Sequence, residues 1–239
     1  MIKFEPQEEY TSSWDWTVKH SRYHFDNTRA DQTGEWWTPL GRFIGNWEDD
    51  VARALAKQNR AITWGTRKDS PYYRTEDGGF EQSKMIVQEE NDLRSTGAPV
   101  DLALTDVAEQ ADIGPTLTKI YEFFGLEDPW VRLHLQQPGQ MFNLHIDKLW
   151  ERCPEDPERI CRIVVHLEDW KPGQFYSYGT QVLTHWRAGD AHTFDWPNVP
   201  HATANASRTV RPTMIMTGLK TERTRQVLAS ASGLSIYPI

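Results

Sequence analysis

The sequence predicts a mainly β protein with flanking helices, whose core is a double-stranded β-helix, or jelly roll. Three observations support this. From residue 130 onward the hydrophobic pattern has a period of two, eight short strand-like stretches follow at close spacing, and turn-forming residues separate most of them. The 239 residues are enough for one large core. We expect a single domain: a mixed N-terminal support region (1–129), the jelly-roll core (130–220) and a C-terminal segment (221–239).

The support region contains two predicted helices. Asn46 is typical of an N-cap, acidic residues fill the next turn, and apolar residues recur at helical spacing over about residues 47–58. The second helix follows Gly114, with Pro115 at its first position, an apolar stripe, and Gly125 just beyond its end. Such a stripe is typical of core packing.

The other parts outside the core have weaker patterns. Residues 1–45 are rich in aromatic side chains but show no clear period, so we expect loops with short strands. Lys84–Gln88 is typical of a strand. The residues after Lys220 form a polar segment that can hold a short helix.

The core is predicted from alternation. Val131, Leu133 and Leu135 alternate with polar residues, which is typical of a half-buried strand. Pro138-Gly139 then turns the chain. The expected strands begin at Trp130 and continue with Gln140–His145, Ile160–Leu167, Gln174–Tyr178, Gln181–Trp186, Ala191–Asp195, His201–Asn205 and Thr213–Leu219.

Composition argues against several classes of function. The formal net charge is −8 and no run of basic residues occurs, so the clustered positive charge that neutralises nucleic-acid phosphates is missing. No stretch approaches the roughly 18 apolar residues of a membrane span, and the first residues contain no apolar signal core. We therefore expect a soluble, cytoplasmic protein. Cys153 and Cys161 are too few for a zinc site and are expected to be reduced thiols.

Two histidines and one aspartate carry the chemical prediction. His145 and Asp147 form a His-x-Asp triplet at the end of the second expected strand, where alternation directs both to one face, and His201 opens the seventh. Two imidazoles and a carboxylate are the donors of the facial triad that holds non-haem Fe(II) and leaves positions open for substrate and O₂. A second triplet, at His24 and Asp26, lies in unpatterned chain, so we do not expect it to bind metal.

An arginine at the eighth expected strand can hold a co-substrate. Arg211 follows His201 by ten positions, and a guanidinium can bind a carboxylate through two parallel hydrogen bonds. Arg208 is the competitor, and we expect it to be a surface charge. The alternative for the whole set is a jelly-roll core with satisfied polar residues, which would leave the ordered spacing unexplained.

The segment from about Val131 to Leu219 resembles the Fe(II)/2-oxoglutarate dioxygenase superfamily, and it is most similar to the aspartyl/asparaginyl β-hydroxylase-like branch. In that family the His-x-Asp triplet lies on the second strand of the jelly roll, the distal His on the neighbouring seventh strand, and an Arg of the eighth strand holds the far carboxylate of 2-oxoglutarate. The resemblance implies that His145, Asp147 and His201 bind Fe(II) and that Arg211 binds 2-oxoglutarate. It covers a little over a third of the chain.

The same branch places a histidine of the third strand, a neighbour of the eighth, against the co-substrate. This implies that His166 contacts 2-oxoglutarate, with Arg162 on the same face as a weaker candidate, whereas the alternative for His166 is a hydrogen-bonded core histidine. Strand geometry also places possible substrate contacts around the mouth of the roll: Gln137, Gln140, Asn143, Trp150 and Tyr176. The histidines without a carboxylate at ligand spacing are expected to be structural: His134, His185 and His192.

The resemblance implies a dioxygenase that uses Fe(II), 2-oxoglutarate and O₂ to hydroxylate an unactivated C–H bond of an amino-acid-like substrate, small or peptidyl, with formation of succinate and CO₂. Two alternatives stay open. One is a non-catalytic metal-binding jelly-roll or cupin protein that binds a ligand or partner, and the other is a metal-dependent isomerase or hydrolase of cupin type. The identity of the substrate, desaturation as the outcome, and the oligomeric state also stay open.

Overall fold

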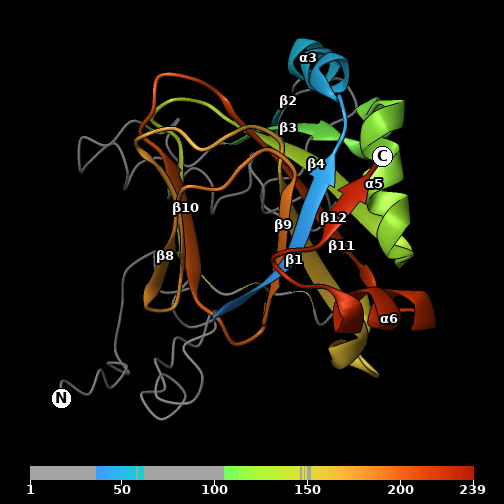
Figure 1. The fold of residues 1–239 in the computed structure, drawn as a ribbon. Helices are drawn as coiled ribbons and strands as arrows, with labels where there is room; N and C mark the ends of the chain where they lie inside the picture. The colour runs from blue at the N-terminus through green and yellow to red at the C-terminus, as the bar shows by residue number, and fades with distance from the viewer. Residues whose placement is uncertain (1–35, 58, 62–104, 146, 148, 150–151) are drawn as a thin grey trace, which may run out of the picture.

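Two β-sheets face one another, and helices cover the outer side of the larger one (Figure 1). The computed structural model describes residues 36–57, 59–61, 105–145, 147, 149 and 152–239, with backbone only for 59–61, 105–106 and 143–145. The expected strand Lys84–Gln88 and the triplet at His24 lie outside the described residues. In the part of the chain that is described, no helix is long and apolar enough to cross a membrane.

The larger sheet has eight strands within the described residues, in the order β12-β1-β9-β6-β11-β4-β3-β2. All neighbours are antiparallel except β1 and β12, which are parallel. In that order the strands are Ile236–Pro238, Trp37–Ile44, Asp190–Phe194, Ile160–His166, Arg211–Leu219, Glu127–Gln136, Thr105–Glu109 and Asn59–Ala61.

The smaller sheet has the order β5-β10-β7-β8, and its pairs are antiparallel. Its strands are Met141–His145, His201–Asn205, Gln174–Tyr178 and Gln181–Leu183. The eight consecutive strands β4 to β11 are thus divided between two sheets, with β9-β6-β11-β4 facing β5-β10-β7-β8, which is the strand order of a jelly roll. The predicted fold class is confirmed, including the adjacency of the second and seventh strands and of the third and eighth.

Helices α3 (Glu48–Lys57), α5 (Pro115–Phe124) and α6 (Glu222–Ser230) lie on the side of the larger sheet that faces away from the smaller one (Figure 1). Both predicted helices of the support region and the short helix after Lys220 are therefore present. Single 3₁₀ turns occupy Gln110–Asp112 and Pro157–Arg159.

The ends of α3 and α5 follow from particular side chains. The Asn46 side chain accepts a hydrogen bond from the backbone N–H of Glu48 at 3.2 Å, as expected for an N-cap. Gly114, at the N-terminus of α5, has no side chain to cap the helix, and the buried carboxylate of Asp50 in α3 does so instead. Its Oδ2 accepts from the N–H groups of Thr116 and Leu117 at 2.8 and 3.0 Å. The two helices are therefore joined through a carboxylate 66 residues away in sequence.

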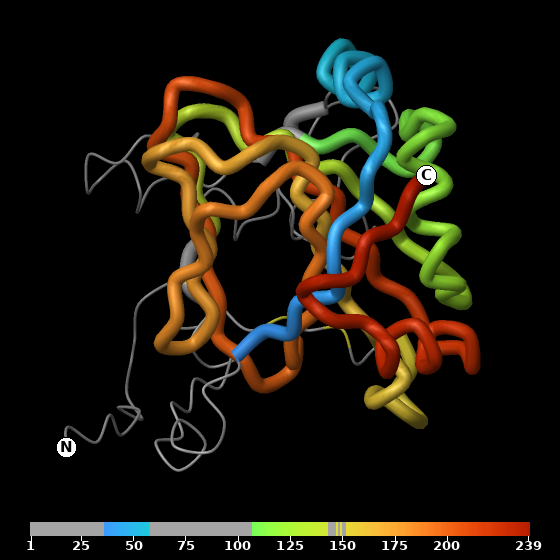
Figure 2. The backbone as a smooth tube through the Cα atoms, in the orientation of Figure 1, coloured from blue at the N-terminus to red at the C-terminus, as the bar shows by residue number. Residues whose placement is uncertain are grey.

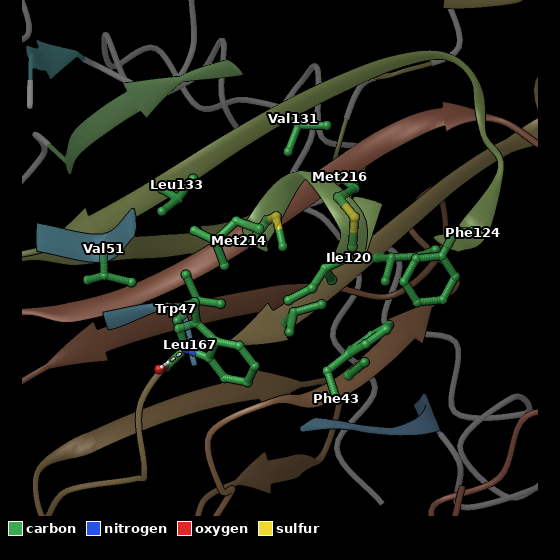
Figure 3. Packing of buried hydrophobic residues seen from close by; sticks show 14 of the residues in the cluster. Phe43, Trp47, Val51, Ile120, Phe124, Val131, Leu133, Leu167, Met214 and Met216 are labelled. Atoms are coloured by element: carbon green, nitrogen blue, oxygen red, sulfur yellow. Dashed lines mark hydrogen bonds between the residues drawn. The ribbon is translucent and has the colours of Figure 1, made fainter. Parts of the chain in front are cut away.

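The main hydrophobic core lies between the helices and the outer face of the larger sheet. Met214 and Met216 of β11 point toward Ile120 of α5 in Figure 3. Trp47 packs into the same core, and its indole N–H donates to the carbonyl of Leu167 at 2.9 Å. Burial of these side chains is worth roughly 1.5–3 kcal/mol each before the loss of conformational entropy is counted.

The interior between the two sheets differs from this core because it is partly polar. A second cluster of buried aromatic and aliphatic residues occupies part of it, and Figure 2 shows the two sheets as opposite walls around it. The alternation in β4 predicted one buried and one solvated face, and this is wrong. Arg132 and Gln136, on the polar face, are only 3% and 1% exposed. That face points into the jelly roll, while Leu133 on the other face belongs to the main core.

The larger sheet extends beyond the predicted core at both edges, with β1 and β12 next to β9, and β3 and β2 next to β4. The region expected to form loops with short strands supplies β1, whose neighbours are β9 and the C-terminal β12. The Tyr237 hydroxyl donates to the carbonyl of Leu40 at 2.9 Å and fastens β12 to β1. Cys153 and Cys161 are free thiols, as expected, and both are buried.

Candidate functional site

The candidate metal centre lies where β5 and β10 meet in the smaller sheet. The backbone of His145, the last residue of β5, is directly opposite His201, the first residue of β10. Two residues further along β10, Thr203 pairs with Phe142, so β5 contains one more residue than β10 between the two pairs. This is a β-bulge, a feature that often occurs beside active sites and changes the direction of a side chain. The side chain of His145 lies outside the described part of the structure.

Asp147 and His201 are brought together in the interior. Oδ2 of Asp147 lies 3.6 Å from Nε2 of His201, and both residues are 7% exposed. The other ring nitrogen of His201, Nδ1, is 3.1 Å from the carbonyl of Val199. Because a carbonyl only accepts hydrogen bonds, Nδ1 carries the proton, and in a neutral imidazole Nε2 then presents its lone pair toward Asp147.

These two donors fit a metal ion. Bonds of about 2.0–2.2 Å from a metal to an imidazole nitrogen or a carboxylate oxygen can span donors up to roughly 4 Å apart, so one ion can contact both atoms of the pair. The hydrogen bond to Val199 is the arrangement that orients metal-binding histidines. Among the described residues, no three His, Cys, Asp or Glu side chains are placed so that they could hold one metal ion together. The third donor of the expected triad, at position 145, is one whose side chain is not described.

Three arginines point into the interior from the larger sheet. Arg132 on β4 forms a bidentate pair with Glu109, at 3.0 and 2.9 Å. Arg162 on β6 places its Nε 3.1 Å from Oδ2 of Asp147, the oxygen that also faces His201. Arg211 has no carboxylate partner among the described residues. The interior therefore has a local excess of positive charge at Arg211, whereas Arg162 lies beside the carboxylate of Asp147.

Arg211, the first residue of β11, is held by the smaller sheet. Its Nη1 donates to the carbonyls of Phe175 and Ala204, both at 3.0 Å, and its Nη2 donates to the hydroxyl of Thr203. The guanidinium lies 4.5 Å from the ring centroid of Tyr176, a cation–π distance. Burial lowers the pKa of Arg211 from its ordinary value. Its Nε is buried without a hydrogen-bond partner among the described residues.

His166 on β6 lies near Arg211. The ring stacks on Trp186 at 4.2 Å between centroids and 10° between planes. It is 1% exposed, and neither of its nitrogens has a hydrogen-bond partner among the described residues. Burial, followed by the proximity of His192 and Arg211, lowers the pKa of His166 well below its ordinary value. The ring is therefore neutral, with one donor and one acceptor, and the alternative of a hydrogen-bonded core histidine is not what the structure shows.

Two interior residues, Gln136 and Tyr178, were not singled out from the sequence. Gln136 lies directly opposite Arg211 in the sheet register, and neither polar atom of its amide has a hydrogen-bond partner among the described residues. Tyr178 is hydrogen-bonded to Nε2 of His192 at 2.7 Å, and burial lowers the pKa of His192 to about 3. The alternation of β4 could have shown Gln136, because it shares a face with His134 and Arg132.

The residues expected to contact substrate lie in different places: some in a turn, one in the interior, and others outside the described residues. The side-chain amide oxygen of Gln140, Oε1, accepts from the backbone N–H of Gln137 at 2.8 Å, within the turn between β4 and β5. Tyr176 is not at the mouth: it is buried between Arg211 and Thr213 and donates to the Thr213 hydroxyl at 3.3 Å. Trp150 and the Asn143 side chain lie outside the described residues. Arg208 is exposed, as expected for a surface charge, and His185 is also exposed.

Neither protein-family models nor curated protein sequences gave a match to this chain. Among solved structures, it is similar to a prolyl hydroxylase from Trichoplax adhaerens in complex with a hypoxia inducible factor peptide fragment, at 10% identity and TM-score 0.42, covering 92% of this chain and 97% of that one. It is similar to a Pseudomonas putida prolyl-4-hydroxylase at 20% identity and TM-score 0.37, covering 57% and 86%. A predicted oxalate decarboxylase from Thermotoga maritima is similar at 13% identity and TM-score 0.32, covering 48% and 81%.

Proposed function

We propose that the protein is an Fe(II)- and 2-oxoglutarate-dependent dioxygenase that hydroxylates an unactivated C–H bond. The observation that carries the proposal is the meeting of Asp147 and His201 at 3.6 Å inside the jelly roll, with residue 145 directly opposite His201. Residues opposite one another on antiparallel strands belong to the same face of a sheet. A shared role of positions 145 and 201 in metal binding requires this pairing of β5 with β10.

Each residue has a defined part in this proposal. His145, Asp147 and His201 would hold Fe(II). Arg162 would orient Asp147 through their ion pair, in which Nε of Arg162 lies 3.1 Å from Oδ2 of Asp147. Fe(II) with 2-oxoglutarate and O₂ would supply the oxidising chemistry, with succinate and CO₂ as co-products. The chain's own contribution is to position the reactants and to exclude water from a largely buried interior.

Arg211 is the proposed anchor for 2-oxoglutarate. It is the interior arginine without a carboxylate partner among the described residues, so an added carboxylate would compensate a charge that burial makes costly. The neutral ring of His166, whose two nitrogens have no hydrogen-bond partner in the part of the chain that is described, can donate to the same co-substrate. For the substrate we propose an amino-acid-like molecule, free or peptidyl, by resemblance to the aspartyl/asparaginyl β-hydroxylase-like branch.

Metal analysis tests the first part. His145→Ala and His201→Ala should lose Fe(II) when the purified proteins are loaded anaerobically and their iron content is measured. His185→Ala is the matched control, because His185 is exposed and its ring stacks on Trp170 at 4.1 Å between centroids. It should retain iron. Wild-type iron content in both His145→Ala and His201→Ala would remove the proposal.

Co-substrate binding tests the second part. Anaerobic addition of 2-oxoglutarate to the Fe(II)-loaded protein should give a visible charge-transfer band, and aerobic incubation should release succinate. Arg211→Ala should keep its iron but require more 2-oxoglutarate. A protein that binds Fe(II) but shows neither the band nor succinate would instead be a metal-binding jelly-roll protein without this activity. The substrate would then be sought by measuring succinate release across amino acids, peptides and small acids.

A further inference from the structure

Three neighbouring side chains in the interior have polar atoms without a hydrogen-bond partner among the described residues: both atoms of the Gln136 amide, both ring nitrogens of His166, and Nε of Arg211. All three residues are at most 3% exposed. Most buried polar groups in folded proteins are hydrogen-bonded, and each exception calls for an explanation. Three exceptions side by side on one sheet indicate a binding site.

The sheet register brings these groups together. Gln136 at the end of β4 is directly opposite Arg211 at the start of β11. Two residues along β11, Thr213 is directly opposite His166 on β6. Since residues i and i+2 of a strand share a face, all four positions lie on the interior face of the larger sheet. Gln136 and His166 therefore flank Arg211 from its two neighbouring strands.

The N–H groups of Arg211 that have no acceptor among the described residues indicate which kind of ligand can bind. Of the five N–H groups of a guanidinium, both on Nη1 of Arg211 and one on Nη2 are used by protein acceptors. The two that remain, on Nε and Nη2, can form a fork that matches a carboxylate. The Gln136 amide adds two N–H donors from the adjacent strand and brings no charge. A carboxylate can accept from these donors and compensate the charge of Arg211.

We propose that Gln136 is a specificity-determining residue that donates a hydrogen bond to the carboxylate held by Arg211. The inference rests on the proposed function, in which that carboxylate is the far end of 2-oxoglutarate. The neutral amide is important, because a carboxylate at position 136 would itself neutralise Arg211 and repel the ligand. Gln136 thus allows the charge of Arg211 to be compensated only by a bound acid.

Two readouts of opposite sign test this in Gln136→Met, which keeps the shape of the side chain and removes its polar atoms. Without 2-oxoglutarate, the melting temperature should stay the same or rise, because a buried amide without partners is removed. The affinity for 2-oxoglutarate, titrated calorimetrically into the Fe(II)-loaded full chain without O₂, should fall roughly 10- to 100-fold, the expected cost of one hydrogen bond to a charged group. Iron content should be unchanged.

Gln136→Glu is the second variant, and it should bind 2-oxoglutarate still more weakly because its carboxylate competes for Arg211. Gln226→Met on the surface of α6 is the control and should change neither quantity. Unchanged affinity in either position 136 variant, or a loss of stability in Gln136→Met, would overturn the role of Gln136. Failure of the wild-type protein to bind 2-oxoglutarate would instead overturn the proposed function and, with it, this inference.

Discussion

Replacing Thr203 measures how much its hydrogen bond with Arg211 contributes to the stability of the protein. Its hydroxyl accepts a hydrogen bond from Nη2 of Arg211 and donates one to the carbonyl of Phe175 at 3.0 Å. Thr203→Val preserves the shape of the side chain but removes both bonds. Arg211 then loses one of its three protein acceptors while it stays buried.

The magnitude can be worked from these contacts. A hydrogen bond to a charged group contributes about 1.5–3 kcal/mol to stability, and leaving a buried donor without an acceptor has a cost of similar size. For a chain of this length, each kcal/mol shifts Tm by about 2–4 °C. Thr203→Val should therefore lower Tm by about 3–12 °C, as measured by calorimetry, with urea unfolding as the independent check.

Thr213→Val is the matched control. Thr213 is also buried, but its hydroxyl accepts from a neutral donor, the Tyr176 hydroxyl, at 3.3 Å. Thr213→Val should lower the free energy of unfolding by about 0.5–1.5 kcal/mol. A Tm for Thr203→Val equal to that of the wild type, or a loss no larger than that of Thr213→Val, would refute the charge-assisted role assigned to Thr203.

Three further outcomes are expected. Asp50→Ala should destabilise the protein by about 1–3 kcal/mol in urea unfolding, because α5 loses the acceptor for two N–H groups; an unchanged midpoint would contradict this capping role. Gly114→Ala should also lower the midpoint, since the added Cβ would lie 1.9 Å from Asp50 Oδ1, and a stabilised variant would show that the two helices separate easily. Burial lowers the pKa of His192 to about 3, below about 6.5 in the unfolded chain. Stability from this group is present above pH 6.5 and is lost toward pH 3, by at most about 1.4 kcal/mol per pH unit. His192→Gln should flatten this dependence, and an unaltered slope in urea midpoints would argue against it.

The jelly roll could be predicted because its signals are local. Period-two alternation and turn residues mark each strand, and in this fold the strand number determines which strands are neighbours. His201 on the seventh strand was therefore expected beside the second strand, and the β5–β10 pairing agrees. The ends of α5 were also predictable, since Pro115 and Gly125 act through their own backbone angles.

What the sequence could not show depends on contacts between distant segments. Alternation shows that two faces of β4 differ but not that both are buried, so Arg132 was expected on a solvated face. For the same reason Gln137 was selected as a possible contact while its neighbour Gln136 was not. The cap supplied by Asp50 and the parallel pairing of β1 with β12 join residues far apart in the chain, and no short pattern encodes such pairs.

The bulge between β5 and β10 has a consequence for how this site can vary through evolution. Three steps along β5, from Phe142 to His145, match two steps along β10, from Thr203 to His201. Deleting one residue in this interval would give two steps on each strand, restore regular pairing and leave positions 145 and 201 opposite one another. A homologue that lacks the extra residue should therefore keep both the sheet and the pairing of these two positions.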